Sequence, residues 1–161
     1  GTSKDIVVPG KFDGYDGYKV KIKSFKDAGI KMGDSLVVGT PENQVIFDGI
    51  SLAGAFQGNS GYQSIDLSGL DTSKVTDMNS MFYRCSNATF IDVANFDTSN
   101  VIDMSNMFAY CKSLIKLNLC KFDTSNVASS ENMFYYCESL ETIYISYKWS
   151  LNIYPCPRAL L

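Results

Sequence analysis

Apolar and polar residues follow one pattern along most of the chain, and this pattern repeats every 26 residues. Three copies keep the register without an insertion, and they share Asp71, Asp97 and Asp123; Val75, Val101 and Val127; Met81 and Phe82, Met107 and Phe108, Met133 and Phe134; and Cys85, Cys111 and Cys137. A weaker copy lies upstream, where Phe56, Ile65, Leu67 and Leu70 precede Phe82, Ile91, Val93 and Phe96 by the same period. A fixed period of about 20 to 50 residues indicates a solenoid.

The first half of each copy has the spacing of a short helix. In the copy at 97–122, apolar side chains recur at intervals of three and four, which places them on one helical face: Val101, Met104, Phe108 and Cys111. The polar residues from Asp97 to Asn100 could cap the start of that helix. We therefore expect one short helix in every copy.

The second half of each copy has the spacing of a strand. Leu117 and Leu119 alternate with Lys116 and Asn118, so the leucines share one face of an extended segment. The spacing of the leucines is that of a leucine-rich repeat. The predicted fold class is α/β: a right-handed, leucine-rich-repeat-like solenoid with a parallel sheet on one side, short helices on the other, and a small N-terminal β-rich cap.

The pattern also predicts where the array begins and ends. Residues 1–44 form the cap or a small separate β module, because Tyr18, Val20 and Ile22 alternate with lysines and a hairpin-like turn follows at 40–43. The repeats are expected at 45–70, 71–96, 97–122 and 123–148. Residues 149–161 then form a cap or an aborted repeat, in which Trp149 covers the last layer and Pro155 and Pro157 prevent a helix.

Charge and composition exclude several classes of function. The 161 residues carry a net charge of -3 and are 45% hydrophobic, which suits a packed core and gives no basic surface for nucleic acid. No apolar stretch reaches the roughly 18 residues that a membrane-spanning helix needs. The chain has no histidine, so it lacks an imidazole general base and any histidine-containing metal site. We expect no enzymatic activity and no cofactor.

Two columns of repeated residues could carry chemistry, although packing and turns explain them as well. Cys85, Cys111 and Cys137 would stack near disulfide distance, but three parallel side chains pair poorly and buried thiols act as small apolar groups. Cys120 is expected on the outer strand face, and Cys156 could meet another thiol near the C-terminal end. The aspartates that precede each Thr-Ser pair could form a calcium ladder, yet we expect them to cap turns, since no glycine-rich calcium loop accompanies them.

The repeated phrase resembles a known family. DTSKVTDMNSMFYRC, DTSNVIDMSNMFAYC and DTSNVASSENMFYYC, each followed by an apolar alternation, are similar to the BspA-like leucine-rich-type repeats of bacterial surface proteins and lipoproteins. The resemblance extends from about Val45 to Ile153. It implies a repeat array on an exported or surface-anchored protein that acts in adhesion or in binding host proteins, without enzymatic activity.

The columns that change between copies are the best candidates for a binding surface. The strand residues predicted to point away from the core form two rows: Ser64, Phe90, Lys116 and Thr142; and Asp66, Asp92, Asn118 and Tyr144. These rows mix aromatic, charged and small polar residues as protein-contact surfaces do, although a plain solvated face would also fit. A second exposed candidate is the tyrosine group Tyr83, Tyr110, Tyr135 and Tyr136, which could anchor a partner or fill the space between turns.

These observations favour a monomeric, non-enzymatic repeat protein that is secreted or held at the cell surface. Its sheet face would bind a host or extracellular protein or a glycan. The alternative is a structural spacer or envelope-associated scaffold without a ligand of its own. The first residue is Gly1 rather than Met, which fits a trimmed chain or a mature secreted form.

Overall fold

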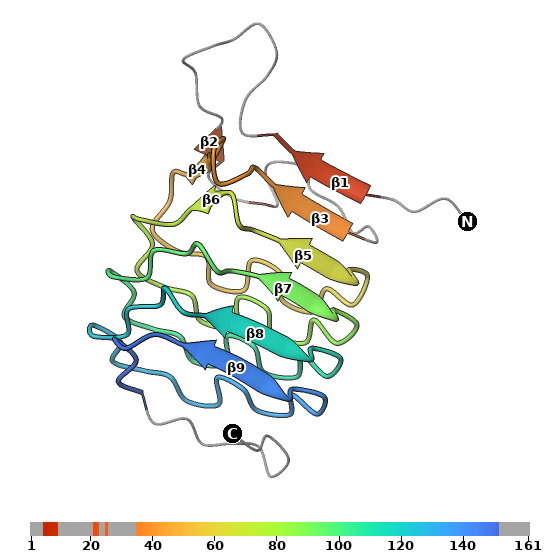
Figure 1. Ribbon diagram of the computed structural model, residues 1–161, viewed down its shortest axis with the longest axis vertical. Coiled ribbons are helices and arrows are strands. Elements are labelled where there is room, and N and C mark those ends of the chain that lie inside the picture. Colours follow the sequence, from red (N-terminus) through yellow and green to blue (C-terminus); the bar gives the residue numbers. More distant parts are fainter. Residues whose placement is uncertain (1–4, 10–20, 23–24, 26–34, 152–161) are drawn as a thin grey trace, which may run out of the picture.

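The chain forms a parallel β-solenoid in which each coil stacks on the one before it (Figure 1). The computed structural model describes residues 5–9, 21–22, 25 and 35–151. The strands are β1 (Asp5–Val8), β2 (Lys21–Ile22), β3 (Ser35–Val38), β4 (Val45–Phe47), β5 (Ser64–Asp66), β6 (Leu70–Asp71), β7 (Phe90–Asp92), β8 (Lys116–Leu119) and β9 (Thr142–Ile145). The predicted solenoid is confirmed, and so is its parallel sheet.

One side of the solenoid carries a stack of parallel strands. The strands β1, β3, β5 and β7 form one hydrogen-bonded sheet, and β8 pairs with β9 just beyond it. Figure 1 shows β7 and β8 as neighbours in the same stack. Ile65 faces Ile91 across the first sheet, and Leu117 faces Ile143 across the second, so apolar side chains repeat at the same register on the inner face.

A second, shorter set of parallel contacts forms the next side of each coil. The strands β2, β4 and β6 pair in that order. Further along the coils, single parallel bridges join Ser51 to Asp77, Asp77 to Asp103, and Asp103 to Ser129. Each coil therefore contacts the next on several sides.

The predicted helices are wrong: the described residues contain no helix, and turns occupy the expected positions. Backbone N–H groups there alternate between a carbonyl three residues back and a carbonyl of the next coil. Met81 donates to Met78, whereas Phe82 donates to Met107 at 2.9 Å. Because every second N–H group bonds to the following coil, the backbone cannot form the continuous local bonds of an α-helix.

Left-handed residues make this turn geometry possible. In the repeat at 45–70 they are Gly54 and Gly58, with φ of 62° and 73°. The later coils place other residues at the same positions: Ser80 and Arg84, Asn106 and Tyr110, and Asn132 and Tyr136, with φ between 54° and 62°. A left-handed residue reverses the local curvature, so the apolar spacing that indicated a helix arises here from successive turns.

The core is a set of repeated columns that run the length of the solenoid. Phe56, Phe82, Phe108 and Phe134 stack face to face, with successive ring centroids 5.5, 5.3 and 5.8 Å apart. Methionine side chains fill the neighbouring positions and are fully buried at Met78, Met81, Met104 and Met107. Stacked rings and flexible thioethers fill the repeated layers, which suits a core built from one repeated motif.

The turn predicted at 40–43 is present, but it does not join two antiparallel strands. Thr40 and Asn43 exchange two backbone hydrogen bonds of 3.1 Å. The flanking strands β3 and β4 then pair in parallel with β5 and β6 of the next coil. Of the strand predicted near Tyr18, only Lys21–Ile22 lies within the described residues, and the limits of the N-terminal cap stay a prediction.

Two glycines allow the backbones of adjacent coils to approach closely near this turn. Gly39 has a φ of 61°, and a Cβ atom on Gly69 would lie 2.2 Å from the Thr40 nitrogen. The Gly69 carbonyl accepts a hydrogen bond of 2.8 Å from the Val45 N–H. Only a residue without a side chain fits between these backbones.

Trp149 contacts the last coil as predicted. Its side chain is half-buried against the core cluster, and its indole N–H donates to the Leu151 carbonyl at 3.1 Å. Pro155, Cys156 and Pro157 lie outside the described residues.

Candidate functional site

The first candidate row lies on the outer face of the strand stack. Ser64 is opposite Phe90, and Lys116 is opposite Thr142, as the 26-residue register requires. Phe90 leaves 49% of its surface exposed, and Lys116 is also exposed. An exposed phenylalanine on a hydrogen-bonded strand gives this face one rigid apolar contact point.

Three of the four side chains in the second candidate row accept hydrogen bonds from the backbone. The carboxylates of Asp66 and Asp92 accept hydrogen bonds of 2.9 Å from the backbone N–H groups two residues on. The Asn118 side chain accepts the equivalent bond from Cys120 at 3.1 Å. These three side chains stabilise the turn that follows each strand. Tyr144 replaces them in β9 and is 50% exposed.

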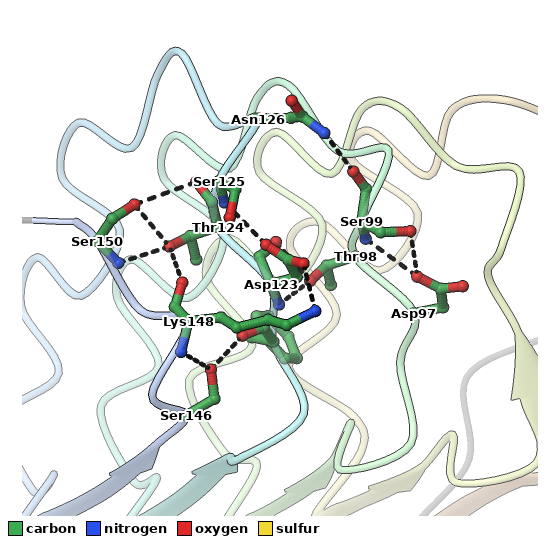
Figure 2. Close-up of polar contacts among 11 residues, drawn as sticks. Asp97, Thr98, Ser99, Asp123, Thr124, Ser125, Asn126, Ser146, Lys148 and Ser150 are labelled. Atoms are coloured by element: carbon green, nitrogen blue, oxygen red, sulfur yellow. Dashed lines mark hydrogen bonds and ion pairs between the residues drawn. The ribbon is translucent and has the colours of Figure 1, made fainter.

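The Asp-Thr-Ser-Asn segment builds a corner that holds adjacent coils together (Figure 2). The Thr98 hydroxyl donates to the Asp123 carbonyl at 3.0 Å and accepts from the Asp123 N–H at 2.8 Å. The Asn126 side chain donates to the Ser99 carbonyl of the preceding coil at 2.7 Å. Thr98 is buried, so its hydroxyl satisfies two backbone groups that water does not reach.

The aspartate column serves this corner, in agreement with its predicted role in a turn. Asp71, Asp97 and Asp123 each accept a 3.0 Å hydrogen bond from the backbone N–H group two residues on. Among the residues that the structure describes, no three His, Cys, Asp or Glu side chains converge as a metal site would require.

Asp123 has a perturbed pKa. Hydrogen bonds from the Ser125 side chain and from Lys148 lower its pKa to about 2. The Lys148 ammonium lies 2.9 Å from the carboxylate, and this contact raises the pKa of the lysine. The pair joins the last coil to the preceding one.

The cysteine column is a set of buried thiols, as the core interpretation predicted. The Sγ atoms of Cys85, Cys111 and Cys137 donate to the carbonyls of Phe56, Phe82 and Phe108 at 3.1, 3.2 and 3.0 Å. Burial raises the pKa of Cys85 to about 12 and raises that of Cys111 further. These thiols are therefore poor nucleophiles. Cys120 is exposed, on the outer side as predicted.

A cluster of aromatic side chains lies on the turn side of the coils. We call it the tyrosine patch, and it consists of Tyr83, Arg84, Tyr110, Tyr135 and Tyr136. The rings of Tyr110 and Tyr136 stack at 5.2 Å with an angle of 11°, while Tyr83 meets Tyr110 edge-on at 5.5 Å. Tyr135 and Tyr136 remain 45% and 44% exposed. The tyrosines thus contact one another across coils and still present a surface.

Arg84 is the member of the patch that sequence reasoning missed. Its guanidinium carbon lies 5.2 Å from the Tyr83 ring centroid and 5.5 Å from that of Tyr110. The signal was present in the repeat register, since Gly58, Arg84, Tyr110 and Tyr136 occupy equivalent positions. A glycine in this column indicates that the backbone there is left-handed.

Comparisons with known proteins place the chain in a family by its repeats. A search of curated proteins and a search of solved structures found no match. The described residues also contain no helix that is long and apolar enough to cross a bilayer. One family matches residues 50–153, which is more than half of the chain and includes both rows of the sheet face. The chain belongs to this family, whose description is Mycoplasma protein of unknown function, DUF285.

Proposed function

We propose that the chain is a non-enzymatic module of a secreted or cell-surface protein, and that its sheet face binds an extracellular protein or a glycan. One observation carries the proposal. The inward columns of the strands keep apolar residues in every coil, whereas the outward row changes from Ser64 to Phe90, Lys116 and Thr142. The structure needs the inward columns to stay apolar, and it leaves the outward row open to select a partner.

The geometry of this face supports binding. Phe90 and Tyr144 are half exposed although each sits in a paired strand. Holding aromatic side chains on a rigid sheet lowers the entropy that association must offset. Aromatic residues are also the ones that contribute most often to binding energy at interfaces.

The location outside the cell rests on the resemblance to BspA-like repeats, which stays a prediction. The repeated DTSNV and MF segments of those surface proteins are similar to the segments that build the corner and the turn ladder here. The proposed site is compatible with an exposed array, because it lies on one continuous side of the stack (Figure 1).

The second candidate function is a spacer, and the second row of the sheet face favours it. Asp66, Asp92 and Asn118 accept hydrogen bonds within their own turns, so these side chains serve the fold first. A spacer needs a regular, hydrated array and no selective surface. The two functions differ in whether the outward aromatic residues affect any binding event.

The test is a binding screen of the purified chain against matrix proteins, serum proteins and arrayed glycans. The key variant is the double substitution Phe90→Ser/Tyr144→Ser, which should weaken binding to any ligand found by about tenfold or more. The matched control is Ile102→Ser, because Ile102 is 52% exposed but lies outside the strands of the sheet face. No binding by the folded chain would support the spacer, whereas binding that survives the double substitution would contradict the sheet-face site and point to another surface of the chain.

A further inference from the structure

The tyrosine patch stands where the backbone favours glycine. Arg84, Tyr110 and Tyr136 have φ of 61°, 62° and 56°, and Gly58 occupies the equivalent position of the repeat at 45–70 with φ of 73°. The left-handed conformation is strained for a residue with a large side chain. Three successive coils keep a large side chain at this position all the same.

The other left-handed column carries smaller residues. It consists of Gly54, Ser80, Asn106 and Asn132, residues that are small or that tolerate this conformation. The large side chains are therefore confined to the column that builds the patch. Strained residues of this kind concentrate at ligand-binding sites, where their side chains have a role.

Arg84 gives the patch a positive charge, and it takes part in no ion pair within the part of the chain that the structure describes. The ion pairs among the described residues are Lys74 with Asp48, Lys112 with Glu138, and Lys148 with Asp123. The guanidinium group instead lies against the Tyr83 and Tyr110 rings and remains exposed. The patch thus offers one anion-binding group beside partly exposed aromatic rings.

The backbone beneath the patch leaves little for a peptide strand to pair with. The N–H groups of Gly58, Arg84 and Tyr110 all donate to carbonyls of the next coil, at 2.7, 2.9 and 2.7 Å. Strand addition needs main-chain groups without partners. The nearby Lys112 is held by Glu138 at 3.0 Å, so the surface is also unsuited to a polyanion.

We infer that the tyrosine patch is a second binding site, separate from the sheet face, and that its ligand is a saccharide with a single acidic group. The apolar C–H face of a sugar ring packs on the exposed part of Tyr136, because the Tyr110 ring is stacked against Tyr136 and contacted by Arg84. The tyrosine hydroxyls bond to sugar hydroxyls, and the Arg84 guanidinium binds the carboxylate or sulfate. A carboxylated sugar and a sulfated sugar share this chemistry.

The experiment is calorimetric titration of the full chain with three probes: sialyllactose, sulfated lactose and lactose. The Kd for one or both acidic probes should be about tenfold below that for lactose, as expected for one charge-assisted contact. The probe that binds more tightly identifies the acidic group. Equal affinity for all three probes, or no binding of any, would overturn the inference.

Variants separate the charge from the aromatic surface. Arg84→Gln should remove the preference for acidic probes and leave lactose unchanged, whereas Arg84→Lys should keep part of the preference. Tyr136→Gly should weaken the binding of all three probes, because it removes an aromatic ring from the site. The same substitution relieves the strain of the left-handed backbone. Arg84→Gln alone tests the assignment if Tyr136→Gly does not fold. A preference for the acidic probes that survives Arg84→Gln would contradict the assignment.

Two further controls distinguish this site from the sheet face and from a site for an acidic peptide. Phe90→Ser/Tyr144→Ser should leave saccharide binding intact, so failure of the sheet-face proposal and failure of this one give different results. A glutamate-rich peptide serves as the competing ligand class. Tighter binding of that peptide than of either acidic saccharide would replace the saccharide by an acidic protein segment.

Discussion

At the scale of single residues, the repeated threonines satisfy backbone groups of a neighbouring coil. The Thr72, Thr98 and Thr124 hydroxyls each donate to a carbonyl of the following coil and accept one of its N–H groups. Among the described residues, no buried side-chain nitrogen or oxygen lacks a partner. Repetition at these positions therefore reflects hydrogen bonding between layers.

Asp123 makes the stability of the protein depend on pH. Its pKa is lowered from an ordinary value of 3.8 to about 2, so the folded state favours the ionised carboxylate more than the unfolded state does. The stabilising contribution is complete above about pH 4 and is lost as the pH falls toward 2. Urea denaturation at a series of pH values should show a loss of stability in this window.

Two variants identify the source of that loss. Asp123→Asn should flatten the pH dependence in this window, because the amide does not titrate. Lys148→Gln should flatten it only in part, since the hydrogen bonds from Ser125 remain. An unchanged pH dependence in Asp123→Asn would show that other carboxyl groups cause the loss.

At the scale of secondary structure elements, the strands were predicted correctly from sequence, whereas the turns were wrongly predicted to be helices. Leu117 and Leu119 alternate with exposed residues over a strand whose neighbours repeat the pattern, so the prediction of β8 was right. The outward direction of Phe90 and Tyr144 followed from the same alternation. Whether these residues bind a ligand stays a prediction.

The helix prediction failed because hydrophobic spacing does not report the sign of φ. Met104, Phe108 and Cys111 are buried as a helical face would be, yet Asn106 and Tyr110 between them are left-handed. Hydrogen bonds to the next coil replace local ones, and a window within one repeat contains no information about them. The glycines at 54 and 58 in the weakest copy were the available sign of this geometry.

The close contact at Gly69 predicts the effect of adding one methyl group. Gly69→Ala would place a Cβ atom 2.2 Å from the Thr40 nitrogen and 2.3 Å from the Gly39 carbonyl carbon, so the two coils would have to separate. We expect a loss of at least about 3 kcal/mol, the upper range for overpacking, measured by urea denaturation.

Gly58→Ala is the matched control for this substitution. Gly58, unlike Gly69, has a positive φ, but a Cβ atom there would meet nothing within 4 Å. Only the left-handed backbone is penalised, at about 1–2 kcal/mol. Equal losses in the two variants would show that the contact between coils does not determine the cost.

At the scale of the whole molecule, each coil contacts only its neighbours, and the core continues through all of them. The stacked phenylalanines and the buried leucines connect layer to layer without a break in the described residues. Damage to one inner layer should therefore destabilise the layers on both sides.

Leu117→Asp tests this continuity. Leu117 is 1% exposed between β7 and β9, so the substitution buries a charge without a partner. We expect a loss of at least about 4 kcal/mol, with cooperative unfolding of the array in circular dichroism. Lys116→Asp, on the exposed side of the same strand, should change stability little. If Leu117→Asp melted at the same temperature as the unsubstituted chain, the inward register of Leu117 in β8 would be wrong.

The exact 26-residue spacing of the coils affects how the gene can gain or lose repeats. Because Phe96 of one coil and Phe122 of the next hold equivalent places and stack on each other, removing residues 97–122 would join two ends already in register. A gene that gains or loses one whole repeat thus encodes a longer or shorter rod with the same layers. Its surfaces, in contrast, change with every such event, so the scaffold lets length and surface pattern vary while folding is preserved.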